Sequence, residues 1–238
     1  MKSPKILLII PAYNEESSIE KTINLVKNSN YDYIVINDGS TDSTEKLLKS
    51  NHAHYISLLS NLGIGGAVQT GYKYAHDMNY DIAIQFDADG QHDISFIDSL
   101  IKPILDQKAN LVIGSCFIDK TAKNRRSSKA RQLGIRFLSN VIKAFSGKRI
   151  YDPTSGFRAA DQKVIEYFAN HYPLEYPEPI SNFELLKNPS YKIKEVPVKM
   201  NKREHGKSSI NSRKTLYAGF NVLLSIIILS LERKHHHD

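Results

Sequence analysis

Residues 82–93 read IAIQFDADGQHD, a largely apolar run that ends directly in two aspartates. The run Ile82–Phe86 is short and mostly apolar, which is typical of a buried strand. Asp87 and Asp89 follow at the point where that strand would end. In open α/β sheets, ligands bind beyond the carboxyl ends of the strands. The stretch therefore predicts a buried strand that carries a pair of carboxylates to a binding site.

Strand-like and helix-like segments alternate on both sides of this stretch. Ser17-x-x-Glu20 reads as a capping box, in which two side chains satisfy free amides at the start of a helix. We expect strands at residues 6–10, 33–37, 55–59, 82–86 and 111–115, and helices from about 17, at 44–50, at 67–78 and at 96–107. This alternation is typical of an α/β fold with a mostly parallel central sheet flanked by helices.

Polar or glycine-rich segments follow the first four of these strands. They are PAYNEE at 11–16, NDGSTD at 37–42, NLGIGG at 61–66 and DADGQHD at 87–93. Because the carboxyl ends of parallel strands meet at one edge of a sheet, we expect the four segments to lie together. The glycines of the third segment lack the full GxGxxG spacing, which disfavours a nicotinamide cofactor.

The second half of the chain is less regular. Residues 130–145 have helical periodicity, DPTSGFRA at 152–159 reads as a loop and turn, and residues 191–198 alternate like a strand. We expect a main domain over residues 1–210, followed by a C-terminal apolar helix and tail over 211–238.

The C-terminal segment 216–231 is almost wholly apolar. It falls short of the roughly 20 residues that a helix needs to cross a bilayer. The first interpretation is a helix that packs on its own domain or on another subunit of a homo-oligomer. The second is contact with a membrane surface.

The composition is that of a chain that can bury a real core, since 41% of its residues are hydrophobic. The single cysteine, Cys116, cannot form a disulfide within this sequence and fits a reducing compartment; we expect a buried structural thiol. The apolar run 6–10 is too short for the core of a signal peptide. We therefore expect a cytoplasmic protein, with peripheral contact at the inner face of the cell membrane under the second interpretation of the C-terminal helix.

Positive charge is concentrated in one segment. Residues 120–149 contain ten Lys or Arg and no Asp or Glu, so that the rest of this chain of net charge +7 is net negative. Such a segment indicates either a solvated surface or an anionic partner, such as phosphates, acidic lipid headgroups or nucleic acid. Nucleic acid is disfavoured, because the sequence holds no recognisable nucleic-acid-binding module.

Asp87 and Asp89 suit a hard divalent cation. Two carboxylates with one residue between them supply oxygen ligands and leave coordination positions for water and substrate phosphates, as Mg²⁺ or Mn²⁺ needs. The metal would neutralise charge on a departing diphosphate. Acidic triplets are common in loops, so the position at the end of an apolar strand carries much of this hypothesis.

The order of these motifs resembles that of family 2 glycosyltransferases of the GT-A fold. The segments at 11–16, 38–42 and 87–92 follow the family's order, and DPTSGFRA at 152–159 is similar to the DxTSGFR element of its dolichyl-phosphate mannosyltransferase-like branch. Residues 203–208, REHGKS, are similar to the family's later R-x-x-G-x-S element. The resemblance spans residues 5 to about 210, and it implies an enzyme that uses a nucleotide-diphosphate sugar.

The resemblance also implies roles for individual residues. Asp38 is expected to accept a hydrogen bond from the base, Asp89 to ligate the metal, and Asp87 to lie nearer the ribose or reach the metal through water. The residues expected to bind the nucleotide sugar are Pro11, Ala12, Tyr13, Glu15, Asp38, Gly65, Asp87, Ala88, Asp89, Arg203 and Ser208. Those expected at the acceptor are Arg131, Gly156 and Arg158, with Arg125 and Arg126 as further candidates. The glycines around Gly65 read equally well as the start of a helix.

A general base is needed if the acceptor is a sugar or protein hydroxyl, whereas a lipid phosphate is already ionised and needs little help. Many family members place an acidic residue at a helix start some dozen positions before a Tyr-Lys-Ile strand. Glu178, between Pro177 and Pro179, falls there, and Asp152 is the rival catalytic candidate. A structural role is the alternative for each.

The sequence thus predicts an inverting, metal-dependent transferase that moves a hexose from a nucleotide-diphosphate sugar, with a UDP-sugar preferred. Lipid-phosphate transferases of the family often carry further C-terminal transmembrane helices, and one short apolar helix ends this sequence. This favours a saccharide or glycoprotein acceptor in surface glycan assembly, with a polyprenyl phosphate as the alternative. A hypothesis of another class is an inactive nucleotide- or glycan-binding subunit of an assembly.

Overall fold

A seven-stranded sheet forms the centre of the molecule in the order β3-β2-β1-β4-β6-β5-β7. The computed structural model describes residues 3–118, 129–201 and 212–231. Strand β6 runs antiparallel to its neighbours β4 and β5, and the other neighbouring pairs are parallel. The predicted mostly parallel α/β sheet is confirmed. The strands are β1 (Ile6–Ala12), β2 (Asp32–Asn37), β3 (Tyr55–Ser57), β4 (Ile82–Gln85), β5 (Leu111–Ser115), β6 (Arg158–Asp161) and β7 (Ile193–Pro197).

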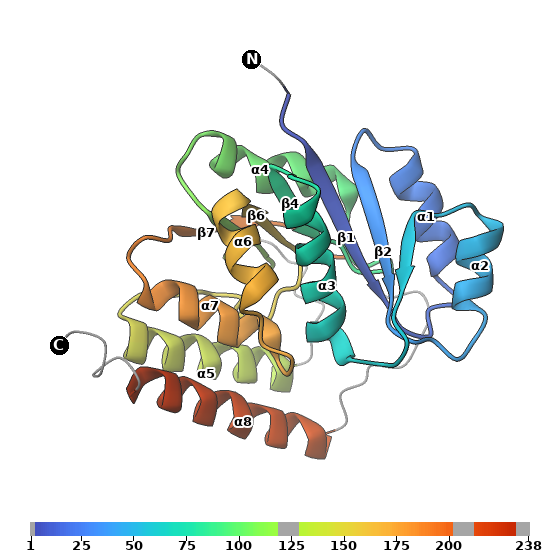
Figure 1. Ribbon diagram of the computed structural model, residues 1–238. Helices are drawn as coiled ribbons and strands as arrows, with labels where there is room; N and C mark the ends of the chain where they lie inside the picture. The colour runs from blue at the N-terminus through green and yellow to red at the C-terminus, as the bar shows by residue number, and fades with distance from the viewer. Residues whose placement is uncertain (1–2, 119–128, 202–211, 232–238) are drawn as a thin grey trace.

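Helices cover both faces of this sheet (Figure 1). Helices α1, α2 and α4 share a buried apolar cluster with one face, and α3, α6, α7 and α8 share a cluster with the other. The helices are α1 (Ile19–Lys27), α2 (Thr44–Ser50), α3 (Gly63–Asp77), α4 (Ile97–Leu105), α5 (Lys129–Ser146), α6 (Gln162–Asn170), α7 (Pro177–Lys187) and α8 (Ser212–Leu231), with a short 3₁₀ turn, η1 (Ile94–Phe96), before α4.

The side chains of β1 show why its sequence is apolar without interruption. Leu7 and Ile9 pack with the α3 side of the sheet, and Leu8 and Ile10 pack with the α1 side. Successive side chains of a strand point to opposite faces, and in a sheet covered by helices both faces are buried. The strand therefore has no solvated side, and its carboxyl end is the first place where polar residues can follow.

Helix α8 packs beside α5 and α7, and Figure 1 shows the three helices side by side. Val222 and Ile226 of α8 are buried in the same apolar cluster as β1 and α3. Burying each such side chain contributes roughly 1.5–3 kcal/mol. No helix in the described ranges is both long and apolar enough to cross a membrane.

Two local predictions were wrong. The residue that precedes α1 is Ser18 rather than Ser17, and no side chain caps the helix, because the Ser18 hydroxyl bonds to Glu15 instead. Segment 152–159 is not all loop and turn, since β6 begins at Arg158 and pairs with both β4 and β5. The apolar signal of this strand is short, and its position between β4 and β5 comes from tertiary pairing.

Candidate active site

The loops after β1 and β2 are joined by hydrogen bonds between backbone amides and side chains. The amide of Asn14 donates to Ser40 Oγ at 3.0 Å, and Asn14 Oδ1 accepts from the amide of Thr41 at 2.8 Å. The amide of Glu15 donates to Thr44 Oγ1 at 2.8 Å. These bonds hold the two loops together at the carboxyl edge of the sheet, as predicted from the strand order.

The residues expected to line the base pocket occupy different settings in this pair of loops. Pro11 and Ala12 are buried at the end of β1, whereas the ring of Tyr13 is 47% exposed. The carboxylate of Glu15 accepts a hydrogen bond of 2.7 Å from Ser18 Oγ. Tyr13 thus offers an open aromatic face on which a base can stack, while Glu15 also supports the start of α1.

Asp38 is buried and joins three segments. Its amide donates to the carbonyl of Ala12 at 2.8 Å, and its Oδ1 accepts from the amide of Leu62 at 2.7 Å. Gly39 has φ +63°, and a Cβ atom there would lie 2.8 Å from the amide nitrogen of Asn61. Asp38 therefore fixes the loop after β2 against the loop that leads into α3. A hydrogen bond from the base to Asp38 stays a prediction.

Gly65 lies in the first turn of α3, so the helix-start interpretation of this segment is confirmed. A Cβ atom at Gly65 would lie 2.4 Å from the carbonyl oxygens of Pro173 and Leu174. Real Cβ contacts are longer than this, so the helix requires glycine here to pack against the segment before α7. Contact between Gly65 and a nucleotide stays a prediction.

Asp87, Ala88 and Asp89 follow β4 in a compact loop. Asp89 is only 6% exposed, and its Oδ1 accepts from the amide of Gln91 at 3.0 Å. The side chain of Asp87 is 34% exposed. The amide of Asp87 donates to His92 Nδ1 at 2.9 Å, which leaves the proton of a neutral ring on Nε2, 3.5 Å from Asp87 Oδ2. The loop thus turns Asp87 towards solvent and keeps Asp89 largely inside.

The two carboxylates fit a hard divalent cation. Both supply oxygen ligands, the kind that Mg²⁺ and Mn²⁺ favour. In the part of the chain that the structure describes, no three His, Cys, Asp or Glu side chains gather into a complete metal cluster. Asp87 and Asp89 would therefore share such an ion with phosphate oxygens and water, as the sequence led us to expect.

The segment before β6 lies against this loop. A Cβ atom on Gly156 would lie 2.8 Å from Gln85 Nε2 and 3.4 Å from Asp87 Oδ2. Ser155 Oγ donates to the carbonyl of Gly114 at 2.6 Å, which fixes the segment to β5. The ring of Phe157 stacks on His92 with centroids 4.5 Å apart. Gly156 therefore lies beside Asp87. Its lack of a side chain leaves room for Gln85 and for the carboxylate of Asp87.

Arg158 lies deeper than an acceptor contact requires. It is fully buried, and its Nη1 donates to Ser181 Oγ at 3.0 Å. Its Nη2 donates to Gln85 Oε1 at 3.4 Å and to the hydroxyl of Tyr172. The guanidinium also lies 5.7 Å from the ring centroid of Phe168. This setting differs from the expected contact with an acceptor, because both Nη atoms donate to groups of the protein itself.

Glu178 is connected to Asp87 through the side chain of Gln85. It lies in the first turn of α7, between two prolines, and follows Tyr176, whose φ is +49°. Gln85 Nε2 lies 3.4 Å from Glu178 Oε1 and 3.5 Å from Asp87 Oδ1, so one amide group connects the two carboxylates. Burial raises the pKa of Glu178, the charge of Arg158 opposes that rise, and the Asp87 carboxylate adds to it.

Asp152, the rival base, is buried in a different set of contacts. Its Oδ2 accepts from the amide of Cys116 at 3.3 Å, and its own amide donates to Glu195 at 2.8 Å. Burial raises the pKa of Asp152 to about 6, the Glu195 carboxylate adds to the rise, and the charge of Arg131 partly offsets it. Asp152 thus organises the turn before Gly156, and Arg131 of α5 lies within electrostatic reach of it.

Cys116 is partly buried. Burial, with the Asp152 carboxylate as a smaller cause, raises the pKa of its thiol to about 11. A thiol with such a pKa stays protonated at neutral pH, and the thiolate is the reactive form. This fits the structural thiol expected from the sequence.

Residues 7–169, more than half of the chain, match the family model "Glycosyl transferase family 2". The chain belongs to this family. It is a glycosyltransferase, and the motif order that suggested the family from the sequence is confirmed.

Two relatives with assigned activities are named for polyprenyl-phosphate acceptors. The UDP-N-acetylglucosamine–dolichyl-phosphate N-acetylglucosaminyltransferase of Methanococcus voltae is 32% identical, and the match covers 97% of this chain and 98% of that protein. The undecaprenyl-phosphate mannosyltransferase of Micrococcus luteus is 27% identical over 87% of this chain and 88% of its own length.

A solved structure shares the fold. It is the glucosyl-3-phosphoglycerate synthase of Mycobacterium tuberculosis in complex with Mn²⁺, UDP-glucose and phosphoglyceric acid. The TM-score is 0.70 and the identity 20%, over 96% of this chain and 80% of that one. This likeness shows that the fold is the GT-A glycosyltransferase fold.

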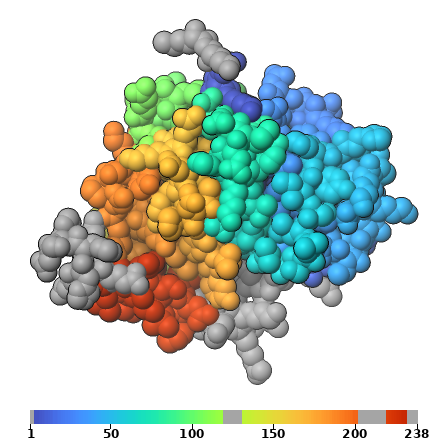
Figure 2. Space-filling model, in the orientation of Figure 1, coloured from blue at the N-terminus to red at the C-terminus, as the bar shows by residue number. Residues whose placement is uncertain are grey.

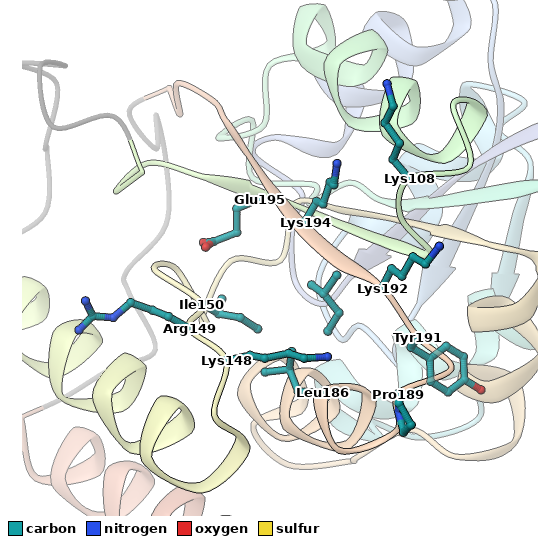
Figure 3. Close-up of a pocket in the computed structure, with 11 residues that line it drawn as sticks. Lys108, Lys148, Arg149, Ile150, Leu186, Pro189, Tyr191, Lys192, Lys194 and Glu195 are labelled. Carbon is teal, nitrogen blue, oxygen red and sulfur yellow. The ribbon is translucent and has the colours of Figure 1, made fainter.

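The GT-A site is distinct from a basic cavity of about 350 Å³ beside the edge strand β7 (Figure 3). Lys194 of β7 and Lys192 just before it, together with Lys108, Lys148 and Arg149, contribute five cations to its lining. In Figure 3 the guanidinium of Arg149 and the amino group of Lys108 point away from one another. These charges do not converge on one point, and lysines on an edge strand protect it from pairing with another sheet.

Some predicted residues cannot be placed. Arg203, Ser208, Arg125 and Arg126 lie outside the described residues. Conversely, the sequence interpretation overlooked residues that the fold brings to the site. They are Gln85, His92, Tyr172, Ser181 and Asn182. For Gln85 the available signal was a polar residue in the otherwise apolar strand β4.

Proposed function

We propose that this glycosyltransferase moves a sugar, with inversion, from a nucleotide-diphosphate sugar to a polyprenyl phosphate. The observation that carries the proposal is the meeting of Asp87 and Glu178 on the amide of Gln85, at the carboxyl edge of the sheet. It puts a candidate metal ligand and a candidate base within reach of the same amide nitrogen. A direct displacement needs groups that act on both the leaving group and the nucleophile.

The donor is proposed to lie against the loops after β1, β2 and β4. Tyr13 and Asp38 would contact the base and ribose, and a UDP-sugar is the preferred donor. Asp89, with Asp87 directly or through water, would hold Mg²⁺ or Mn²⁺. Bound there, the metal supplies a charge that stabilises the departing diphosphate. The protein would supply two carboxylate ligands for the ion, and the donor diphosphate would supply further oxygen ligands.

The acceptor assignment replaces the preference that the sequence suggested. The absence of further apolar helices in this sequence favoured a saccharide, but two relatives with assigned activities are named for dolichyl and undecaprenyl phosphate. An oxygen of the acceptor phosphate forms the new bond to the anomeric carbon, and the bond from that carbon to the nucleoside diphosphate breaks. Arg131, which lies within electrostatic reach of Asp152, would meet the acceptor phosphate.

Glu178 has a role even with an ionised acceptor. A phosphate monoester has a second pKa of about 6, so a fraction still carries a proton at neutral pH. Burial raises the pKa of Glu178, which makes it a better proton acceptor than an exposed carboxylate. Glu178 would take that proton, or orient the acceptor oxygen when no proton is present.

A lipid-linked acceptor requires the site to approach a membrane, and α5 and α8 offer the surface for it. Each helix exposes apolar side chains, and α8 lies at the outer edge of the molecule (Figure 2). We propose peripheral contact with the cytoplasmic leaflet through this apolar face. Its members are Leu133, Phe137 and Phe145 of α5 and Phe220, Leu224, Ile228 and Leu231 of α8.

The central test incubates the protein with Mn²⁺ or Mg²⁺ and a panel of radiolabelled nucleotide sugars. One set of reactions receives a short-chain polyprenyl phosphate and the other a mixture of free saccharides. We expect metal-dependent label in the organic phase of the first set. Label that stays in water with a saccharide acceptor would contradict the acceptor, and no turnover of any donor would contradict the transferase proposal.

A second test concerns the apolar face. We expect the double variant Phe137→Glu, Phe220→Glu to lose sedimentation with vesicles that contain anionic lipid. Leu59→Glu is the matched control, because Leu59 is a fully exposed apolar residue on another surface. Light scattering reports the mass of each variant. A fall from dimer to monomer with unchanged vesicle binding would assign the face to a homo-oligomer instead.

A further inference from the structure

Gln85 and Arg158 form a fixed pair in the sheet. They lie directly opposite each other in the antiparallel register of β4 and β6. Gln85 is 1% exposed and Arg158 is fully buried. A shift of register by one residue would turn both side chains to the other face of the sheet. The pairing of β4 with β6 thus fixes the positions of both side chains.

The chemistry of arginine sets the orientation of the Gln85 amide. A guanidinium has only donors, so the group that faces Nη2 of Arg158 at 3.4 Å must be the oxygen of Gln85. The NH₂ group then points the other way, to Asp87 Oδ1 at 3.5 Å and Glu178 Oε1 at 3.4 Å. Both contacts are longer than the usual separation of about 2.9 Å, as expected when one group is shared between two acceptors.

Arg158 has no direct carboxylate partner among the described residues. The groups that accept from its guanidinium are neutral, namely Gln85, Ser181, Asn182 and Tyr172. Its Nε has no hydrogen-bond partner within the described ranges. A buried cation with neutral partners is costly for folding. Its charge is balanced indirectly. Gln85 accepts from Arg158 through its oxygen and donates to the carboxylates of Asp87 and Glu178 through its nitrogen.

We propose that Gln85, oriented by Arg158, is a positioning residue that holds the Asp87 and Glu178 carboxylates in their working arrangement. The inference rests on the proposed function, since it gives these two carboxylates the donor and acceptor sides of the reaction. It assigns Arg158 to the support of the site rather than to the acceptor. Gly156 belongs to the same unit, because a larger residue there would displace the amide of Gln85.

The deciding variant is Gln85→Glu. Glutamate keeps the shape of glutamine and can form an ion pair with Arg158, but an ionised carboxylate cannot donate to Asp87 or Glu178. A purely structural role predicts a protein of unchanged or greater stability that is still functional. The positioning role predicts a folded protein in which UDP binding in the presence of Mn²⁺ falls about 10- to 100-fold, as expected for the loss of hydrogen bonds to charged groups.

The measurements are calorimetric titration of UDP with Mn²⁺ and thermal unfolding, followed by kcat and KM with donor and acceptor. Gln85→Leu is expected to weaken binding and lower kcat in the same direction. Arg158→Lys is expected to keep part of the function because it keeps the charge. Gln69→Glu is the matched control, because Gln69 lies on α3 and bonds to the carbonyl of Ala169, away from the site.

The outcomes separate this inference from the proposed function. If the wild-type protein does not bind UDP with Mn²⁺, the proposed function fails. If the wild-type protein binds and Gln85→Glu binds equally well with unchanged kcat and KM, the positioning role is overturned and the function stands. Loss of binding in Gln69→Glu as well would also overturn it, because the effect would then not be specific to Gln85.

Discussion

The two sides of the active site are built in different ways. The loops after β1 and β2, on the proposed nucleotide side, are held by short hydrogen bonds from backbone amides, many of them near solvent. The proposed acceptor side is held by buried side chains from β4, β6 and α7, with Arg158 in the middle. The first side resembles a pair of capped turns, and the second resembles a polar core.

The difference teaches where each side is vulnerable. Single side chains on the nucleotide side can be lost at modest cost to stability, because neighbouring bonds and water replace them. On the acceptor side, Gln85, Arg158, Ser181 and Asn182 are buried, and leaving one such polar group unpaired costs about 1–3 kcal/mol. Substitutions on the two sides should therefore separate loss of function from loss of folding. The predictions below test that separation, from the largest expected effect to the smallest.

Asp89→Ala should have the largest effect on activity with little effect on folding. Loss of a metal ligand removes several kcal/mol of charge stabilisation, which corresponds to a fall in kcat/KM on the order of 10³-fold. The readouts are kcat/KM and the affinity for UDP with Mn²⁺. Asp98→Asn is the control, because Asp98 bonds to Tyr31 away from the site. Unchanged kcat/KM in Asp89→Ala would refute the proposed metal site.

Glu178→Gln should lower kcat about 10-fold with a polyprenyl-phosphate acceptor, which is mostly ionised already, while UDP binding is retained. Glutamine has the same shape but does not accept a proton. Steady-state kinetics with both substrates measure the change. Glu175→Gln changes an exposed carboxyl in the segment before α7 and should leave kcat unaltered. If Asp152→Asn abolishes kcat and Glu178→Gln does not, the assignment of the base is reversed.

Asp152 should make stability depend on pH in an acidic window. Because its folded pKa of about 6 is above the ordinary 3.8, the folded state holds the proton more tightly than the unfolded state. The free energy of unfolding then falls as pH rises from about 4 to 6, by roughly 2–3 kcal/mol. Urea denaturation across this range measures the fall. Asp152→Asn should reduce the dependence of the free energy of unfolding on pH. The same slope in the variant would show that Asp152 is not the cause of this dependence.

Two Gly→Ala substitutions should have different effects: one should lower kcat, and the other should raise the stability of the protein. In Gly156→Ala the new methyl group meets Gln85, and we expect kcat to fall about 10-fold, or about 1.4 kcal/mol. At Gly134, in α5, a Cβ atom meets nothing within 4 Å. There alanine should stabilise the protein by about 0.5–1 kcal/mol without a change in kcat. Thermal unfolding and kinetics test both, and a fully active Gly156→Ala would show that the site has more room than the structure gives it.

The sequence by itself determined the alternation of elements and the nucleotide side of the site. Asp38, Asp87 and Asp89 directly follow apolar strands, and parallel strands deliver their carboxyl ends to one edge. Local order therefore suffices to bring these residues together. Glu178 was also recognisable, because two prolines at a helix start mark it and the family resemblance places an acid there.

Only the tertiary structure decided where Arg158 lies and which groups it contacts. From the sequence it was an arginine in a loop, and an acceptor contact was the natural interpretation. In the fold it opens β6, which runs antiparallel between β4 and β5 and places Arg158 opposite Gln85. Strand order and register depend on contacts between residues far apart in the chain, and no local pattern encodes them. For that reason the residues that support the carboxylates became visible only once the sheet was assembled.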